Sequence, residues 1–153
     1  MGSGLEQVVY LSRSVPDLPE SELRTIQESA RRNNERDRVS GLLIYDGSRF
    51  LHLLEGPGET LSATVERIRN DRRHGEMTVL IRRPIEARTI HEWSMGVVNL
   101  ARRSRKARAM LAVLSSIADR CASAASEDEA NHAVQDLVAT FAYETPHSRH
   151  EAA

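Results

Sequence analysis

The stretch VSGLLIYDGSRFLHLLEG, residues 39–56, decides the fold. Two runs rich in leucine, β-branched and aromatic residues flank Asp46-Gly47, a pair suited to the positive φ angles of a tight hairpin. Side chains alternate across a strand, so Phe50, His52 and Leu54 share one face of the second run. An imidazole on such an apolar, buried face costs a few kcal/mol unless it finds a hydrogen-bond partner. The stretch therefore predicts a hairpin and poses the question of what His52 binds.

The residues before the hairpin predict a strand and a helix. Residues 7–14 are rich in β-branched and aromatic residues and predict a first strand that carries Tyr10. Ser21 is a candidate N-cap of the helix that follows. Its apolar stripe ends at Asn33 and Asn34, where we expect the helix C-terminus, and consists of Leu23, Ile26 and Ala30.

The residues after the hairpin predict a second helix and two more strands. Residues 58–74 predict a helix with a basic C-terminal turn (Arg69, Arg72 and Arg73) and an apolar face made of Leu61, Val65 and Ile68. Residues 76–88 predict a strand that Pro84 breaks, and residues 92–100 predict a short final strand. The order β-α-β-β-α-β-β predicts an α+β, ferredoxin-like domain over residues 7–100, with a mixed five-stranded sheet and two helices.

Residues 101–144 change in character and predict a C-terminal pair of helices. A polar break, SEDE, separates them. The apolar stripe of the first helix needs burial, either on the open face of the sheet or on a second subunit, and consists of Met110, Leu111, Val113, Leu114 and Ile117. We expect residues 1–6 to be a disordered N-terminus or a tag remnant, and residues 145–153 to be a disordered tail.

Composition narrows the classes of function. The chain has 153 residues, 40% hydrophobic and 28% charged, with a formal net charge of −1, so it gives no electrostatic case for a nucleic-acid partner. The basic run RRSRKAR is expected to be a solvated helix start or a subunit contact. A single cysteine, Cys121, excludes an internal disulfide and fits a reducing, cytoplasmic setting. No run is long and apolar enough to span a membrane, and no signal peptide is expected.

The sequence motifs do not indicate a metal-binding site or a nucleotide-binding site. The six histidines show no metal-ligand spacing, so no metal site is expected. His147 and His150 are three residues apart, but in the polar tail. There is no GxGxxG or Walker motif, and LEGPGE lacks the spacing of a phosphate loop.

The chain resembles the BLUF family, the bacterial blue-light sensors that use a flavin. The resemblance is carried by VVYLSR, NNERDRVSGLLIYDGSRFLHLLEG, IRNDRRH and EWSMG, in the family's order and spacing, over residues 7–100. It implies that the flavin ring lies between the two helices, against one face of the sheet. FAD is the expected cofactor, and FMN or riboflavin would also suit. The residues that the resemblance assigns to flavin binding are Tyr10, Ile26, Asn33, Asn34, Leu43, His52, Ile68, Arg73 and His74.

The resemblance also implies a photoactive group. Tyr10 matches the tyrosine that donates an electron and a proton to the excited flavin. Trp93 and Met95 match the pair of residues that compete for a place near the switching side chain, and the resemblance leaves open which of them points inward. His52 stands where the family has its switching glutamine, which is the major departure.

Histidine does not reproduce the hydrogen bonding of glutamine. A neutral imidazole has one donor and one acceptor on opposite sides of its ring, so His52 could bridge Tyr10 and the flavin. It cannot exchange donor for acceptor by an amide flip, and protonation would place a cation beside the flavin. Tyr10, His52 and Asn34 either satisfy one another or are satisfied by a ligand, and a flavin edge would serve all three. We therefore expect altered photochemistry, with a weak or absent red-shifted state.

These features predict a blue-light sensor, a short stand-alone BLUF protein that is not an enzyme and signals through protein–protein contacts. The tail helices would form the output surface or a dimer contact, because no cyclase or phosphodiesterase domain would fit after residue 100. We expect a homo-oligomer and a downstream protein partner that the sequence does not identify, and no membrane. The alternatives are a light-insensitive or redox-sensing flavin protein, and a ferredoxin-like interaction module without flavin.

Overall fold

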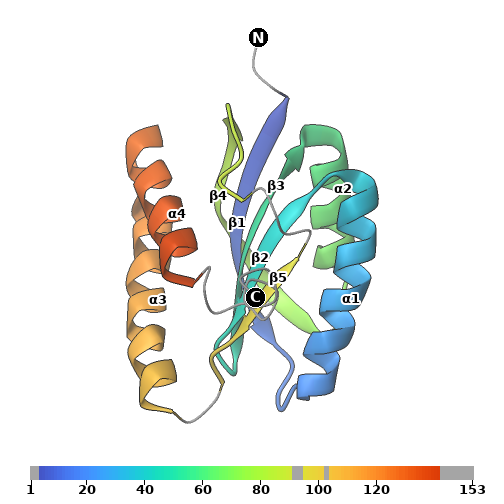
Figure 1. Ribbon diagram of the computed structural model, residues 1–153, viewed down its shortest axis with the longest axis vertical. Helices are drawn as coiled ribbons and strands as arrows, with labels where there is room; N and C mark the ends of the chain where they lie inside the picture. Colours follow the sequence, from blue (N-terminus) through green and yellow to red (C-terminus); the bar gives the residue numbers. More distant parts are fainter. Residues whose placement is uncertain (1–3, 91–94, 102–103, 142–153) are drawn as a thin grey trace, which may run out of the picture.

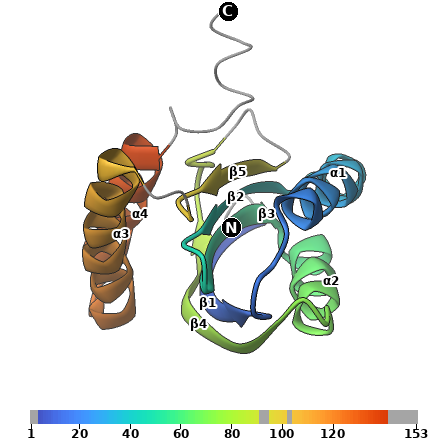
Figure 2. The same cartoon turned by 90° about the horizontal axis from the view of Figure 1, so that it is seen from below.

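The computed structural model describes residues 4–90, 95–101 and 104–141, which form three layers. A five-stranded sheet has α1 and α2 on one face and α3 and α4 on the other (Figure 1), and the view from below separates the layers (Figure 2). The order of elements is β1 (Leu5–Ser14), α1 (Glu20–Asp37), β2 (Ser40–Tyr45), β3 (Arg49–Pro57), α2 (Gly58–Arg69), β4 (His74–Ile85), β5 (Gly96–Asn99), α3 (Arg105–Ser123) and α4 (Glu127–Phe141). The predicted α+β, ferredoxin-like class is confirmed.

The sheet is mixed and has the strand order β4-β1-β3-β2-β5. Neighbouring strands are antiparallel except β2 and β5, which run parallel. In the register of the central strands, His52 lies opposite Tyr10 on one side and opposite Leu43 on the other. This register places the three side chains in one row on the face that α1 and α2 cover.

The β2–β3 hairpin forms as predicted, but the two central residues of its turn are Gly47 and Ser48, one position after the predicted Asp46-Gly47: Tyr45 pairs with Phe50, and the N–H of Asp46 donates to the carbonyl of Arg49 at 3.1 Å. Gly47 has a positive φ of 103°, whereas Asp46 does not. The Asp46 carboxylate instead accepts hydrogen bonds from the backbone N–H groups of Ser48, at 2.9 Å, and Arg49, at 2.6 Å. Aspartate commonly stabilises turns in this way, so one glycine is enough to reverse the chain.

Both predicted ends of α1 were wrong. The helix begins at Glu20 after Pro19, so Ser21 lies inside its first turn and does not cap it. It ends at Asp37, past Asn34, because Arg38 adopts the left-handed conformation with φ 57°. The last turn contains no apolar residue, so an apolar stripe could not reveal it.

Pro84 does not break β4. The strand runs through it to Ile85, and Pro84 lies opposite Glu6 of β1. Because β4 is an edge strand, one side of it has no ladder partner, and a residue without an N–H can be accommodated there.

The polar break SEDE belongs mostly to α4. Ser126 Oγ accepts the N–H of Glu129 at 3.1 Å, and the Glu129 carboxylate accepts the N–H of Ala125 at 2.7 Å. This reciprocal capping starts the helix at Glu127, and acidic residues in a first turn favour the helix dipole.

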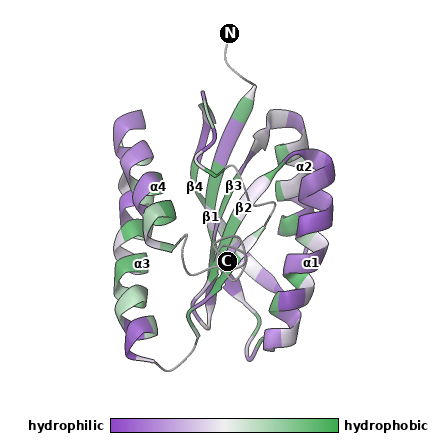
Figure 3. Ribbon diagram, in the orientation of Figure 1, coloured by the Kyte–Doolittle hydropathy of each residue, from purple (hydrophilic) through white to green (hydrophobic). Residues whose placement is uncertain are grey.

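The helices α3 and α4 bury their apolar sides on the chain's own sheet. Leu114, Ile117 and Leu137 pack with Leu51 and Leu53 of β3 in one core. Of the predicted stripe, Val113 remains 42% exposed. Hydropathy colouring shows polar residues along the outer sides of the helices (Figure 3). Within the described ranges, no helix is both long and apolar enough to cross a membrane.

We expect Leu137→Ala to lower the free energy of unfolding by about 2–5 kcal/mol, because it leaves a cavity between α4 and the sheet. Val113→Ala is the control on the exposed side of α3, where we expect a change of about 0.5 kcal/mol or less. Urea denaturation of the two variants tests this, and equal losses would contradict the packing of α4 described above.

Candidate functional site

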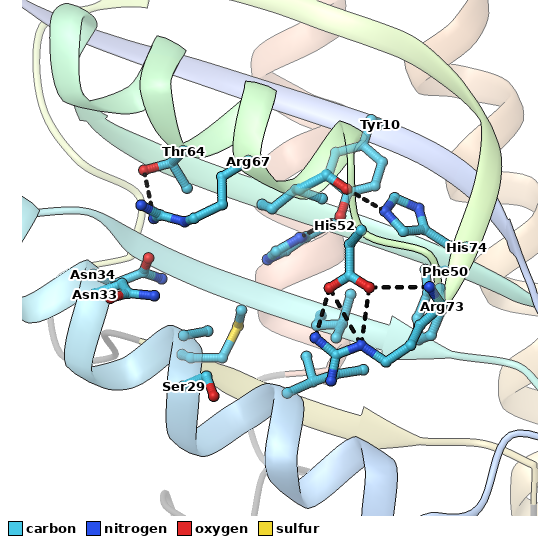
Figure 4. Close-up of a pocket in the computed structure, with 16 residues that line it drawn as sticks. Tyr10, Ser29, Asn33, Asn34, Phe50, His52, Thr64, Arg67, Arg73 and His74 are labelled. Carbon is cyan, nitrogen blue, oxygen red and sulfur yellow. Dashed lines mark hydrogen bonds and ion pairs between the residues drawn. The ribbon is translucent and has the colours of Figure 1, made fainter.

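A cavity lies between α1, α2 and the sheet. Its volume of about 200 Å³ far exceeds the roughly 10–15 Å³ that one buried water needs, so it can hold an organic ligand. Figure 4 shows the side chains that surround it. The cavity is lined by Tyr10, Ile26, Ser29, Ala30, Asn33, Asn34, Leu43, Phe50, His52, Thr64, Arg67, Ile68, Asp71, Arg73, His74 and Met95.

Tyr10 and His52 form a buried pair at the sheet side of the cavity. The Tyr10 hydroxyl and His52 Nδ1 are 2.8 Å apart, a hydrogen-bond distance. Both side chains are almost fully buried, and their rings meet edge to face with centroids 5.2 Å apart. The antiparallel register of β1 and β3 brings them together, which the alternation along each strand could suggest but not fix.

The number of hydrogen-bond partners left over indicates which of the two side chains donates the proton in the bond between Tyr10 and His52. If the phenol donates to Nδ1, only the Nε2–H of His52 lacks a partner. If Nδ1–H donates to the phenol oxygen instead, both the phenol proton and the Nε2 lone pair lack a partner. The phenol is therefore assigned as the donor. Nε2 is buried and has no partner among the described residues. It lies above Gly41, where a β-carbon would come within 3.3 Å of it.

Burial sets the protonation of the pair. It raises the pKa of the Tyr10 hydroxyl above its ordinary value, with a smaller contribution from the Asp71 carboxylate. It lowers the pKa of His52 to about 3, helped by nearby His74. His52 is thus neutral near pH 7, and the positive charge that histidine could have brought to this position does not form.

His74, the first residue of β4, brings a second imidazole to the cavity. Its Nε2 lies 2.6 Å from the carbonyl oxygen of Ile68, at the end of α2. Its Nδ1 is buried and has no partner in the described part of the chain. The ring lies 6.2 Å, centroid to centroid, from both Tyr10 and Phe50. Two of the residues that line the cavity, His52 and His74, thus each have a buried ring nitrogen without a partner among the described residues.

Arg73 is held by two carboxylates. Its guanidinium bonds both oxygens of Asp71, with the shortest contact at 2.6 Å, and reaches Glu22 of α1 at 3.5 Å. The Asp71 contact lowers the pKa of that carboxyl and raises that of Arg73. The predicted helical placement of Arg72 and Arg73 was wrong, because α2 ends at Arg69.

All nine residues predicted to bind the flavin line this one cavity, although their part in binding stays a prediction. Met95 also lines it and is 4% exposed, and its carbonyl accepts a hydrogen bond from Gln27 of α1. Trp93 lies outside the described residues. In the described ranges, no cluster of histidine, cysteine or acidic side chains could hold a metal ion.

Sequence reasoning missed several lining residues. Thr64 sits one turn before Ile68 on the inner face of α2, and Phe50 precedes His52 by two residues on the same strand face, so periodicity could have found both. Arg67 and Asp71 carried no such signal. Arg67 of α2 reaches Asp37 of α1 at 3.8 Å, a long ion pair between the two helices.

Comparison with known proteins agrees with the fold. The sequence model of the BLUF family, described as sensors of blue light using FAD, matches residues 5–96. A photoactivated adenylate cyclase subunit beta of Euglena gracilis is 28% identical over 92 residues, 60% of this chain and 11% of its own length. The blue light- and temperature-regulated antirepressor BluF of Escherichia coli (strain K12) is 32% identical over 77 residues, 50% of this chain and 19% of its own.

A solved structure extends the similarity to the tail helices. BlrB, a BLUF protein in its dark state, superposes with a TM-score of 0.68 at 28% identity, covering 89% of this chain and 96% of the BlrB chain. The matched part of this chain spans about a tenth to a fifth of the length of the two relatives above, but nearly the whole length of BlrB.

The lowered pKa of His52 predicts a stability that falls in acid. As pH drops through about 6.5, the imidazole of the unfolded chain takes up a proton, whereas the folded imidazole stays neutral to about 3. Between these values the unfolded state binds more protons, so the folded state loses stability as pH falls. We expect the wild type to lose stability relative to His52→Gln between about pH 7 and about pH 4, by up to about tenfold in the unfolding constant per pH unit.

Urea denaturation across this pH range measures the effect. His132→Gln is the control, because His132 is exposed on α4, and we expect it to follow the wild type. A constant difference between the wild type and His52→Gln at all pH values would contradict the burial of a neutral imidazole.

Proposed function

The chain belongs to the BLUF family, the sensors of blue light using FAD, and on that premise we propose that it binds FAD in the cavity beside Tyr10 and His52 and responds to blue light. FMN or riboflavin would also suit the ring pocket. A BLUF domain is a sensor and not itself a catalyst. The single observation that carries the binding proposal is a ligand-sized cavity lined by His52, whose buried Nε2 has no partner among the described residues.

The residues around the cavity fit a flavin. The ring is flat and largely apolar with a polar edge, and Ile26, Leu43 and Ile68 offer apolar surface from three different elements. The unpartnered Nε2–H of His52 could donate to an oxygen or nitrogen of the ring edge, and Asn33 and Asn34 line the same cavity. Such a ligand would remove the cost of a buried, unsatisfied donor.

A bound flavin supplies absorption of blue light and, once excited, the power to oxidise a nearby side chain. Tyr10 is the electron donor in this proposal, because it is a buried phenol on the cavity wall. Its proton has a ready acceptor, since the lone pair of His52 Nδ1 lies 2.8 Å from the hydroxyl oxygen. Loss of the electron makes a phenol strongly acidic, so the proton would move to Nδ1 along the existing hydrogen bond.

His52 would make the light-induced state short-lived. An imidazole with a pKa of about 3 holds an added proton poorly and would return it to Tyr10 Oη as soon as Tyr10 regained its electron. It also has no second donor–acceptor arrangement to reach by a flip, as an amide has. We therefore propose an altered photocycle, with a weak or brief red-shifted state.

The same observation favours a second candidate function. If the hydrogen bond between Tyr10 and His52 persists unchanged in light, the protein would be a light-insensitive flavin binder or a redox sensor. Bound yellow flavin without a light-induced difference would support this candidate, and absence of any flavin would leave an interaction module.

Signalling would pass through a protein contact. The Euglena relative is named as a cyclase and the Escherichia coli relative as an antirepressor, so in both a light-sensing region acts on a different activity. We propose that α3 and α4 provide the corresponding contact here, to a partner protein or a second copy of the chain. A reducing, cytoplasmic setting is part of the proposal and agrees with the single, buried Cys121.

We expect protein purified in the dark to carry flavin or to take it up, and to show a light-induced absorbance change that Tyr10→Phe abolishes. Phenylalanine keeps the ring packing but removes the hydroxyl that donates to His52, so the variant should still bind flavin. Absorption spectra before and after blue light test both points. Colourless protein that fails to take up added FAD would refute the binding proposal, and an unchanged response in Tyr10→Phe would refute the role of Tyr10.

We expect His52→Gln to give a stronger and longer-lived red shift than the wild type, because an amide offers donor and acceptor on neighbouring atoms. The measurement is the amplitude and decay of the light-minus-dark spectrum, with exposed His132→Gln as the control. Identical spectra in the wild type and His52→Gln would contradict the account of the substitution.

A further inference from the structure

A buried acid lies on the face of the sheet opposite His52. Glu55 of β3 is fully buried, and its carboxylate accepts three hydrogen bonds: from Gln7 Nε2 at 2.6 Å and from the backbone N–H groups of Thr89 at 2.7 Å and Ile90 at 2.9 Å. A carboxylate in an apolar core is costly unless it is satisfied in this way. Glu55 is thus tied to β1 and to the segment that follows β4.

The topology explains why this segment needs an acceptor. Strands β4 and β5 are the two edges of the sheet, so the chain between them crosses β1, β3 and β2. Backbone groups in such a crossing have no ladder partner, and buried N–H groups must still be paired. Ile90 belongs to the core under α3 and α4, and Glu55 supplies the acceptor at that point.

On one side, this pairing reaches α4. The Oε1 atom of Gln7 accepts a hydrogen bond from Arg83 Nε at 2.8 Å. The two other nitrogens of the Arg83 guanidinium bond the carbonyl of Glu127 at 3.2 Å and Oδ1 of Asn131 at 3.3 Å. Arg83 therefore joins the first turns of α4 to the residue that holds Glu55.

On the other side, it reaches the wall of the cavity. Arg88 bonds the carbonyl of Glu55 at 3.1 Å and Ser40 Oγ at 2.9 Å, and its Nη2 donates to the carbonyl of Arg38 at 2.6 Å. Arg38 is the residue that ends α1, and its backbone N–H bonds the carbonyl of Asn34, which lines the cavity. The same segment continues to Met95, whose carbonyl is bound by Gln27 of α1.

We propose that Arg83, Gln7, Glu55 and Arg88, together called the crossover link, couple the cavity to α4 through the sheet. A shift of the C-terminal end of α1, or of the segment at Thr89 and Ile90, changes how Arg83 holds the first turns of α4. The link gives a change at the cavity a route to the opposite face through Glu55 of β3 and Gln7 of β1. The use of the crossover link in light signalling rests on the proposed function. The coupling between the cavity and α4 does not depend on that function.

The test of the coupling uses the full chain kept in the dark, with FAD added, and measures hydrogen exchange of the Thr89 and Ile90 amides. Arg83→Met removes the bond to Gln7, and we expect these amides to exchange about fivefold faster or more, as for the loss of one ordinary hydrogen bond. The control is Arg82→Met, because Arg82 faces α2 and bonds Ser62 there. It should leave both amides at wild-type rates.

A second variant keeps the test decisive if Arg83→Met folds poorly. Arg83→Lys keeps the charge but cannot make the same set of bonds, and an intermediate acceleration is expected. Wild-type exchange at Thr89 and Ile90 in a folded Arg83 variant would overturn the coupling, as would equal acceleration by Arg82→Met.

Illumination separates the coupling from the function. In the wild type we expect a light-induced change in exchange across residues 127–141; in Arg83→Met the flavin spectrum should still respond while this exchange change is mostly lost. A full exchange change in Arg83→Met would overturn the role of the link in signalling. If the wild-type flavin shows no response to light, the proposed light sensing fails, and the dark measurement still decides whether the coupling exists.

Discussion

The structure depends on one constraint, which is that strand β3 is buried on both faces. Helices α1 and α2 cover the face that carries Phe50, His52 and Leu54, while α3 and α4 cover the opposite face. A strand buried in this way is normally apolar throughout. Here it carries one buried polar residue on each face, His52 and Glu55, and each needs hydrogen-bond partners nearby. The cavity on one face and the buried hydrogen bonds on the other follow from how His52 and Glu55 find their hydrogen-bond partners.

On the cavity side the demand is met only in part. Tyr10 satisfies Nδ1 of His52, whereas Nε2 has no partner among the described residues, and the residue lines a cavity large enough for an organic ligand. A buried donor without a partner is unfavourable in the free protein and becomes favourable when a ligand accepts from it. The unpaired donor therefore lowers the stability of the free protein at the place where a bound cofactor would pair it and restore that stability. Burial also keeps the imidazole neutral near pH 7, because it lowers the pKa of His52 to about 3.

On the other side the demand is met completely, by residues distant in sequence. Glu55 receives Gln7 from β1 and two backbone groups from the segment between the edge strands. Because that segment must cross the sheet, the acid that anchors it also connects the wall of the cavity with the helices on the far face. The edge position of β4 matters as well, since it lets Pro84 remain in a strand and presents Arg83 to α4.

The sequence by itself determined the order of the elements and the hairpin, because periodicity and local turn chemistry act over short distances. Its resemblance to the BLUF family named the nine residues now found around one cavity. It misplaced the ends of α1 at Ser21 and Asn34, since caps depend on backbone angles that an apolar stripe does not report. It gave no sign that Glu55 would be buried and bonded across the sheet. Only the tertiary structure decided that, and with it the protonation of His52, because burial and partners from distant strands exist only once β1, β3 and β4 have paired and both faces are covered.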